Sequence, residues 1–207
     1  SGIRAVKNIV PAADTAVYSM SATTTAYGMA RGISQTGYIG YDLSVGDITL
    51  SFDTSKTTGG TNRSASVSYT GIDGLQVVAG AAETLTAQAN AGIDMETVGV
   101  KYTMGSITVA AQANEVDDAS TSNDDEDATH IGVSFALSDQ VSVSYAQLET
   151  DFGKSTKTAD ETVSGVGVSY TAGSMSIKAY AGKTENDAGS ATAVDLEEKG
   201  VTLSFSF

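Results

Sequence analysis

Apolar and polar side chains alternate along many separate runs of about ten residues, and this alternation leaves the chain few folds to adopt. The stretch VSYTGIDGLQV at 67–77 returns as VKYTMGSITV at 100–109 and as VSYTAGSMSI at 168–177. Side chains two residues apart on a strand share a face, so Val67 and Tyr69 point one way and the intervening serine the other. Two such runs joined by a short turn containing Gly or Asp form a β-hairpin. The repeated unit is therefore predicted to be an antiparallel hairpin.

Alternation and turn residues together predict about eleven strands. The expected strands are 35–44, 47–55, 62–71, 74–83, 94–103, 106–115, 128–137, 140–149, 161–171, 174–184 and 196–207. Their connections alternate between short turns, such as Met104-Gly105, and long polar stretches, such as VDDASTSNDDEDA. One end of the predicted sheet therefore carries only short turns, and the other end carries acidic loops of variable length.

Bulky side chains occupy only one face of these runs, and the other face carries mostly Ser, Thr, Gly and Ala. Two packed soluble sheets would need bulky residues that interdigitate between them.

The net charge of −14 argues against a nucleic-acid partner, which requires a basic surface. No run of about 20 apolar residues is present, so any membrane span must use strands.

Strands of about ten residues with alternating connections are typical of a transmembrane β-barrel, in which the short turns are periplasmic and the long loops extracellular. Aromatic residues stand on the expected outward face near successive short turns, as an interfacial girdle requires. These residues are Tyr41, Tyr69, Tyr102, Phe135 and Tyr170. Ordinary strand aromatics of a soluble sandwich or β-solenoid are the alternative, but they do not explain the alternating connections. The fold class predicted is all-β, an antiparallel transmembrane β-barrel.

The last run, GVTLSFSF at 200–207, carries Val201, Leu203, Phe205 and Phe207 on one face. At this point the chain resembles the general porins of Gram-negative outer membranes, especially those of alphaproteobacteria. The resemblance implies passive diffusion of ions and small hydrophilic solutes through a sixteen-stranded homotrimer. It also implies contacts with outer-membrane lipid and lipopolysaccharide, and a final strand that serves as an assembly signal for the barrel-assembly machinery.

The resemblance divides the chain into two parts. Counted back from a sixteenth strand, the run at 35–44 would be the sixth, so residues 1–34 would match the inward-folded third loop, and 35–207 the barrel wall. The chain would then be an incomplete porin. The alternative is a complete twelve-stranded barrel with a further strand near 15–31, acting as a non-conducting adhesin or surface anchor. Both interpretations stay open at the sequence level.

Pore-lining residues are expected on the face opposite the lipid, because a charge near the bilayer midplane on the lipid face costs about 2–4 kcal/mol. The candidates are Tyr38, Lys101, Gln112, Lys178 and Tyr180. The family resemblance adds a constriction built from Arg4, Lys7, Asp14 and Arg31, for which a rim or loop position is equally open. Small inward residues favour a channel over a plugged barrel, and the acidic loops favour a weak preference for cations.

Catalytic and metal chemistry find less support. His130 is the single histidine, follows an acidic stretch and is expected at a solvated rim, so no enzyme is predicted. Acidic residues cluster near it at Asp117, Asp118, Asp124, Asp125 and Asp127. They are weak Ca²⁺ candidates, because they lack EF-hand spacing and a solvated charge run explains them better. The expectation is no cofactor, with loosely bound Ca²⁺ as the alternative.

Overall fold

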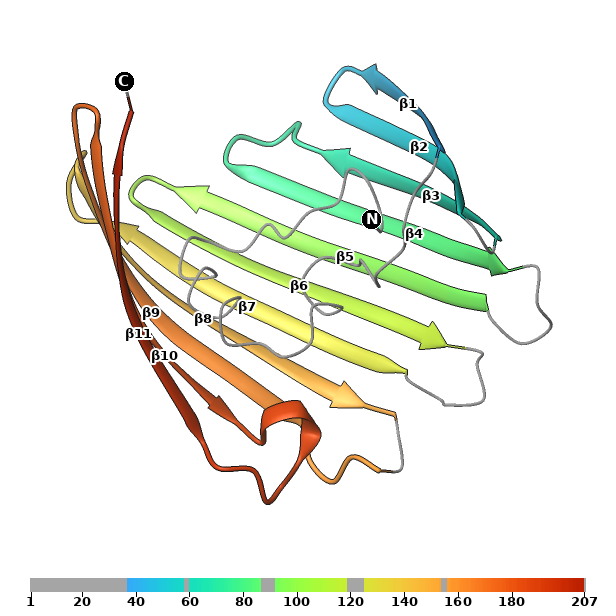
Figure 1. Cartoon of the computed structure of the whole chain (residues 1–207). Coiled ribbons are helices and arrows are strands. Elements are labelled where there is room, and N and C mark those ends of the chain that lie inside the picture. The colour runs from blue at the N-terminus through green and yellow to red at the C-terminus, as the bar shows by residue number, and fades with distance from the viewer. Residues whose placement is uncertain (1–36, 58–59, 87–91, 119–124, 154–155, 207) are drawn as a thin grey trace.

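The computed structural model describes residues 37–57, 60–86, 92–118, 125–153 and 156–206, and these residues form a single antiparallel sheet of eleven strands in sequence order (Figure 1). A short 3₁₀ turn, η1 (Asp187–Gly189), lies between the last two strands. The strands are β1 (Gly37–Val45), β2 (Ile48–Thr57), β3 (Gly60–Tyr69), β4 (Leu75–Thr86), β5 (Gly92–Met104), β6 (Ile107–Asp118), β7 (Glu126–Ala136), β8 (Val141–Phe152), β9 (Glu161–Ala172), β10 (Met175–Glu185) and β11 (Leu196–Phe205).

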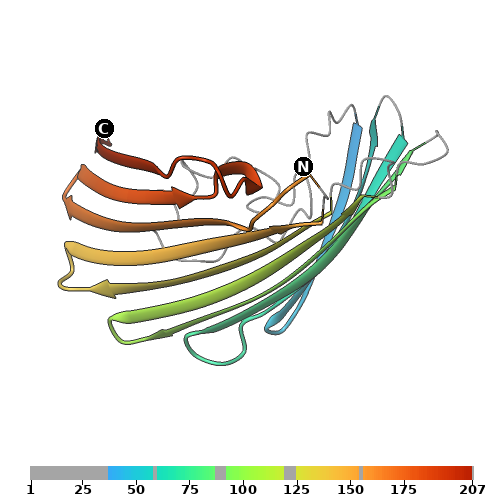
Figure 2. The ribbon, with the colours of Figure 1, turned by 90° about the horizontal axis from the view of Figure 1, so that it is seen from below.

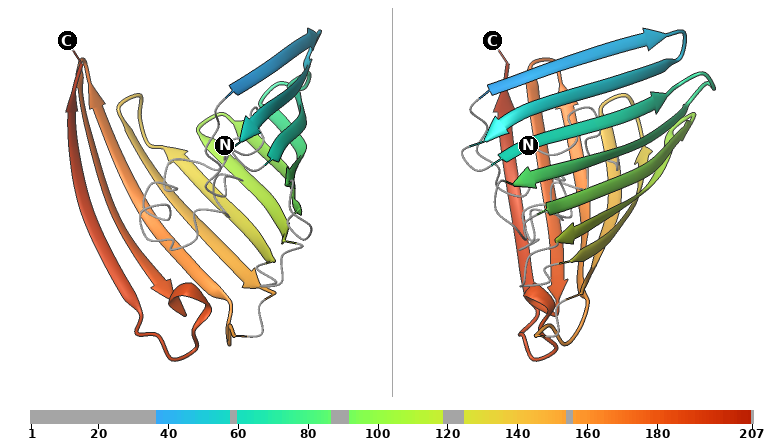
Figure 3. Two further views of the ribbon diagram at one scale, coloured as in Figure 1. Left: turned by 45° about the vertical axis from the view of Figure 1, so that its right-hand side comes forward. Right: turned by 90° about the vertical axis from the view of Figure 1, so that its right-hand side faces the viewer.

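The sheet is twisted and curved like part of a barrel wall (Figures 2 and 3). Its short turns all lie at one end, where the C-terminal end of β11 also lies (Figure 1). Among the described residues, no helix is long and apolar enough to cross a membrane.

Glycine residues allow the two-residue turns of this sheet to form. Gly46, Gly105 and Gly173 each occupy the first position of a two-residue connection and have φ of 58°, 59° and 58°. A positive φ at this position is the feature of the type II′ turn, whose twist matches that of the strands it joins. The predicted alternation holds from β5 onward, where two- and four-residue turns alternate with connections of seven to ten residues. It fails at β2–β3, which only residues 58–59 connect, because these two strands extend further than the sequence pattern predicted.

The two faces of the sheet have the reverse of the polarity found in soluble proteins. The outward, convex face carries exposed apolar side chains, such as Val201 at 74% exposed and Val166 at 52%. The other face carries many buried polar side chains, among them Ser51, Asn62 and Thr97, together with a small buried apolar cluster that includes Met95. An exposed apolar band this extensive indicates contact with lipid or another apolar phase.

Rows of paired residues cross the sheet obliquely to the apolar band. One outward row begins with apolar residues at Val45 and Ile48 and ends with Lys183 and Glu197. In between it passes through Tyr69, Val77, Val100, Ala111, Ile131, Gln147 and Ser164. The change from apolar to polar along one row means that the strands tilt relative to the band, as barrel closure requires.

The aromatic residues proposed as a girdle follow the same tilt. Tyr41, Tyr102 and Phe135 are exposed on the outward face, and Tyr69 and Tyr170 are half-buried there. Tyr69, Tyr102, Phe135 and Tyr170 lie near the short-turn ends of their strands, whereas Tyr41 lies at the middle of β1. The segment 1–34 and the additional strand near 15–31 lie outside the described residues.

Candidate pore wall

Small and polar residues dominate the inward face, as the alternation predicts. Register pairs place the following together on this face: Ser66, Ser68, Gly80, Gly99, Gly132, Ser142, Ser144, Gly165, Gly167 and Ser176. Ser142 and Ser169 share a hydrogen bond of 2.7 Å between their hydroxyls. Such a wall leaves room beside it and offers groups that bind water.

A buried amide cluster joins β5 and β6 on this face. The Thr97 hydroxyl donates to Asn114 Oδ1 at 2.6 Å. Gln112 Nε2 donates to Thr97 Oγ1 and to Asn114 Oδ1, both at 3.2 Å. Because all three side chains are buried, these bonds fix the orientation of Gln112, one of the predicted lining residues.

His130 does not occupy the solvated rim that its place in the sequence suggested. It pairs with Gln112 in the sheet register and is 2% exposed on the inward face of β7. The strand begins at Glu126, so His130 is its third inward-facing residue and lies further from the rim than the start of the strand. The expectation was wrong because the sequence gives the face of a strand residue but not its depth.

Lys101 and Lys178 both lie on the inward face. Lys101 pairs with Gln76 and Ala110 and is half-buried, whereas Lys178 pairs with Ser169 and Thr202 and is exposed. Tyr38 falls on the same face by its pairing with Ser55, and its side chain is outside the described part of the structure. Arg4, Lys7, Asp14 and Arg31 lie outside the described residues.

Tyr180 covers a glycine on the neighbouring strand. Its pairing partner on β11 is Gly200, and a Cβ at residue 200 would lie 2.5 Å from Cε1 and Cζ of the ring. The phenol hydroxyl donates to Glu198 Oε1. Glycine is therefore required at residue 200 for the ring to lie flat against the wall and reach this carboxylate.

Acidic groups outnumber basic groups on the described inward face. Its strand carboxylates are Asp42, Asp53, Glu126, Glu161 and Glu198, and its basic residues are Lys101 and Lys178. Among the inward residues whose side chains the structure describes, five negative and two positive charges leave −5 + 2 = −3, and Asp118 also pairs on this face. The wall therefore has a negative balance on the side away from the lipid.

Two connections at the end opposite the short turns are held to each other. The Thr158 N–H donates to Gly189 O at 2.9 Å, and the Ala188 N–H donates to Glu161 Oε2 at 2.7 Å. Lys157 donates to Ala188 O, and its ammonium lies 4.9 Å from the centre of the Phe152 ring. These contacts fix the β8–β9 and β10–β11 connections as one structured unit at the mouth.

The acidic cluster predicted near His130 is divided between strand ends. Asp117 is exposed on the outward face of β6, Asp127 is exposed on β7, and Asp125 precedes β7. The Asp118 side chain and Asp124 lie outside the described part. Within the described residues, no group of three or more His, Cys, Asp or Glu side chains is arranged to hold a metal ion.

Sequence reasoning missed a row of carboxylates that the sheet register brings together. Glu96 pairs with Glu115, Glu115 with Asp127, and Asp127 with Asp151. These residues lie beyond the apolar band, and the neighbouring charges of Asp127 and Asp117 raise the pKa of Glu115. The signal available in the sequence was an acidic residue at the outer end of each of these runs. Which acidic residues pair with each other depends on the offset between neighbouring strands, and the pattern of a single strand does not give this offset.

An antiparallel wall with an apolar outward face, a polar inward face and tilted strands defines a transmembrane β-barrel of the outer-membrane type. The sequence model of the Gram-negative porins matches residues 12–207. The chain belongs to this family, and the predicted fold class and family resemblance are confirmed.

Several solved structures share the fold at low sequence identity. The anion-selective porin from Comamonas acidovorans matches with a TM-score of 0.64 and 14% identity, over 81% of this chain and 57% of its own. OccK3 (OpdO) of Pseudomonas aeruginosa matches with a TM-score of 0.67 and 14% identity, over 81% and 55%. OmpT of Vibrio cholerae, in its trimer form, matches with a TM-score of 0.63 and 15% identity, over 92% and 73%.

The chain therefore spans a little over half the length of the Comamonas and Pseudomonas proteins. No curated protein sequence matches it significantly.

Proposed function

We propose that this chain forms the wall of an outer-membrane pore through which ions and small hydrophilic solutes diffuse passively. The observation that carries the proposal is the reversed polarity of the sheet, with Ser, Gly, Asn and Lys side chains inside and a continuous apolar band outside. A wall of this kind stabilises water on one side and lipid on the other. Diffusion needs no covalent step, so the proposal assigns no enzymatic activity and no cofactor.

The proposal includes a weak preference for cations. The described inward side chains have a net charge of −3, and the carboxylate row adds negative charge near the mouth. Negative groups at a pore mouth raise the local cation concentration. The Comamonas porin is anion-selective, so the fold itself does not decide the sign of the preference.

Planar-bilayer recording of the full-length protein tests both parts. In a KCl gradient near 0.1 M, the reversal potential should indicate a cation preference, and near 1 M, where the Debye length falls to about 3 Å, the preference should weaken. Lys178→Glu, at an exposed inward position, should increase the preference, whereas Lys199→Glu on the outward face should change it less. Absence of conductance contradicts the pore, and anion preference at low salt contradicts the selectivity.

We also propose a homotrimer in which each protomer has its own pore. OmpT of Vibrio cholerae has a trimer form, and the outward face of β10 and β11 offers small side chains at Ala179 and Ala181 that allow close packing in a membrane. Conductance steps are then expected in groups of three. Single, ungrouped steps from chemically cross-linked samples would contradict the trimer.

The final strand is proposed to carry the assembly signal. Val201, Leu203 and Phe205 form an exposed outward stripe on β11, and Phe207, which lies outside the described residues, continues the sequence pattern. Deleting Phe207 should reduce insertion into the outer membrane by the barrel-assembly machinery while leaving the inward face intact. Normal surface amounts of the truncated protein would contradict this role. Contacts with lipid and lipopolysaccharide are proposed for the outward apolar band.

A further inference from the structure

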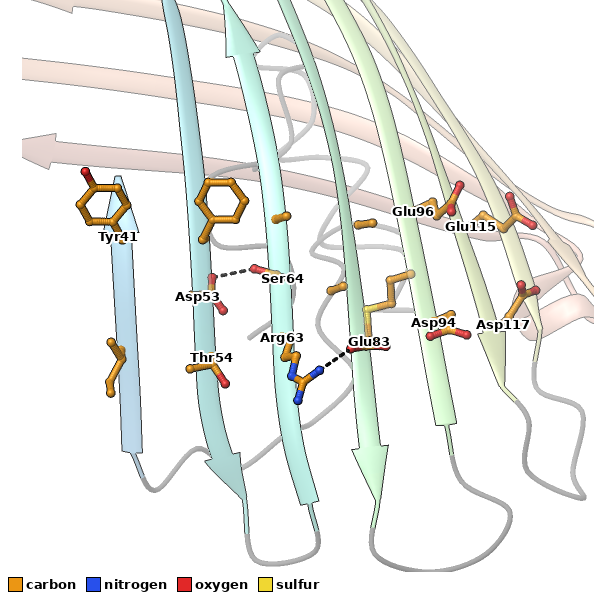
Figure 4. Close-up of a pocket in the computed structure, with 16 residues that line it drawn as sticks. Tyr41, Asp53, Thr54, Arg63, Ser64, Glu83, Asp94, Glu96, Glu115 and Asp117 are labelled. Carbon is orange, nitrogen blue, oxygen red and sulfur yellow. Dashed lines mark hydrogen bonds and ion pairs between the residues drawn. The ribbon is translucent and has the colours of Figure 1, made fainter. Parts of the chain in front are cut away.

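A trough crosses the outward face of β1 to β7. It consists of two adjacent hollows of about 770 and 860 Å³ that share Phe52, Ala65, Ala81, Glu96 and Glu115. These five residues are consecutive members of a single register row, one from each of β2 to β6. Figure 4 shows the first hollow, with Tyr41 on one side and the carboxylates of Glu96 and Glu115 on the other.

The middle of the trough is hollow because the side chains that form its floor are small. Ala65 and Ala81 pair directly across β3 and β4, and Ala79 and Ala113 line the second hollow. Phe52, 48% exposed, stands beside these alanines on β2. The result is an apolar floor bounded by an aromatic ring, which an aliphatic chain can cover.

The opposite side of the trough is strongly acidic. Beyond Ala81 the row continues through Glu96, Glu115, Asp127 and Asp151 on four adjacent strands. Like charges directly opposite each other in a sheet repel, because their Cβ atoms lie about 4.5–5.5 Å apart. A positive group bound between them would relieve this repulsion.

The described residues form no ion pair with the four carboxylates of this row. Among the described residues, ion pairs within 4.0 Å join Arg63 to Glu83, Lys183 to Glu185 and Asp195, and Lys199 to Glu197, and none reaches the four-carboxylate row. Among the described lining residues the basic one is Arg63, and its guanidinium lies 3.5 Å from a carboxylate oxygen of Glu83.

The trough also lies at the edge of the apolar band. The next outward residue towards the short turns is Val98 after Glu96 and Ala113 after Glu115. Since alternate residues on a strand are about 7 Å apart, the carboxylates lie one side-chain row above hydrocarbon-facing residues. The floor can therefore meet an acyl chain while the acidic side stays in contact with water.

We propose that this trough binds an amphiphile of the outer leaflet that has a cationic head group and an aliphatic chain. The chain lies on Ala65 and Ala81 beside Phe52, and the head group lies between Glu96 and Glu115. An anionic amphiphile meets repulsion at the row, and a soluble cation gains nothing from the floor. Charge complementarity and the apolar floor thus select the same occupant.

The test uses the full-length protein in phosphatidylcholine liposomes with tryptophan as a reporter, because residues 1–207 contain no tryptophan and any outside them is replaced by phenylalanine. Phe52→Trp places the reporter in the trough, and Val168→Trp places a control on the outward face of β9. The probes are brominated hexadecylammonium, hexadecanol and hexadecyl sulfate, which quench tryptophan on contact. At residue 52 the ammonium should reach half-maximal quenching at about one-tenth the mole fraction of the alcohol, a difference of about 1.4 kcal/mol. At residue 168 the three probes should quench alike.

Two changes then separate the acidic side from the floor. Glu96→Gln with Glu115→Gln removes the charge, and Ala81→Leu fills the floor while keeping the carboxylates. Each should abolish the tenfold preference, and Glu197→Gln on β11 should leave it intact. A preference that survives either change overturns the proposal, as does tight binding of the sulfate in the presence of Ca²⁺, which would indicate an ion bridge. These outcomes do not depend on conductance, so a failure of this proposal and a failure of the pore proposal can be told apart.

Discussion

At the scale of single residues, the inward face is shaped by close contacts between a large side chain and a glycine. Tyr180 on β10 lies against Gly200 on β11, and its hydroxyl donates to Glu198, so the ring covers part of the neighbouring strand. A methyl group at residue 200 would have to displace the ring from this position. This contact adds to the packing of the buried apolar cluster of Val78, Met95 and Val116 on the same face.

We expect Gly200→Ala to lower the free energy of unfolding by about 1–3 kcal/mol, the usual cost of overpacking. The measurement is the urea midpoint of the folded form, followed by its shift in electrophoretic mobility. Gly92→Ala is the control, because a Cβ at residue 92 meets nothing within 4 Å. Equal midpoints for the two variants would show that the Tyr180 contact is unimportant.

At the scale of elements, the hairpins depend on glycines in two different ways. Gly74 ends the β3–β4 turn with φ of 74°, and a Cβ there would lie 2.1 Å from the carbonyl oxygen of Thr103. The Gly74 carbonyl also accepts a hydrogen bond from the Thr103 N–H at 2.8 Å. Gly105 has φ of 59° with open space around it. The first position needs both conformation and space, and the second needs conformation alone.

Gly105→Ala should therefore cost about 1 kcal/mol for the left-handed backbone, whereas Gly74→Ala should cost clearly more, because backbone atoms of a neighbouring strand must move. Refolding yield into detergent and urea midpoints measure the difference. A smaller effect at Gly74 than at Gly105 would contradict the close approach of this turn to β5.

The two faces of a strand make a second prediction at this scale. Val133 and Ser134 are adjacent on β7, with Val133 outward between Ile131 and Phe135 and Ser134 inward. Val133→Arg should cost about 2–4 kcal/mol and impair assembly, because the charge would face lipid. Ser134→Arg should assemble and alter conductance instead. If both variants insert equally well, the face assignment is wrong.

Most of the strand pattern could be predicted from the sequence, because alternation and turn glycines are local signals. The run expected at 94–103 became β5 (Gly92–Met104), and that at 62–71 became β3 (Gly60–Tyr69). Depth and register are not local, so His130 was placed at the rim and the row through Glu96 and Glu115 was not foreseen. Both depend on the offset between neighbouring strands, which single-strand patterns do not encode.

At the scale of the whole molecule, the sheet register and the apolar band are set at an angle to each other. A row that is apolar at Val45 is charged at Lys183, so the strands tilt across the membrane as in a closed barrel. This arrangement places Lys178 towards the interior and its neighbours Ile177 and Ala179 towards lipid. The central claim is that these alternate positions face water and hydrocarbon.

Single-cysteine labelling tests this claim most directly, because residues 1–207 contain no cysteine and any outside them is replaced by serine. The variants are Ile177→Cys, Lys178→Cys and Ala179→Cys on β10, with Val201→Cys and Thr202→Cys on the paired strand β11. The full-length protein in outer-membrane vesicles is treated with a charged thiol reagent that does not enter lipid. The account predicts rapid labelling at 178 and 202 and protection at 177, 179 and 201. Labelling of the outward positions as fast as the inward ones would contradict it.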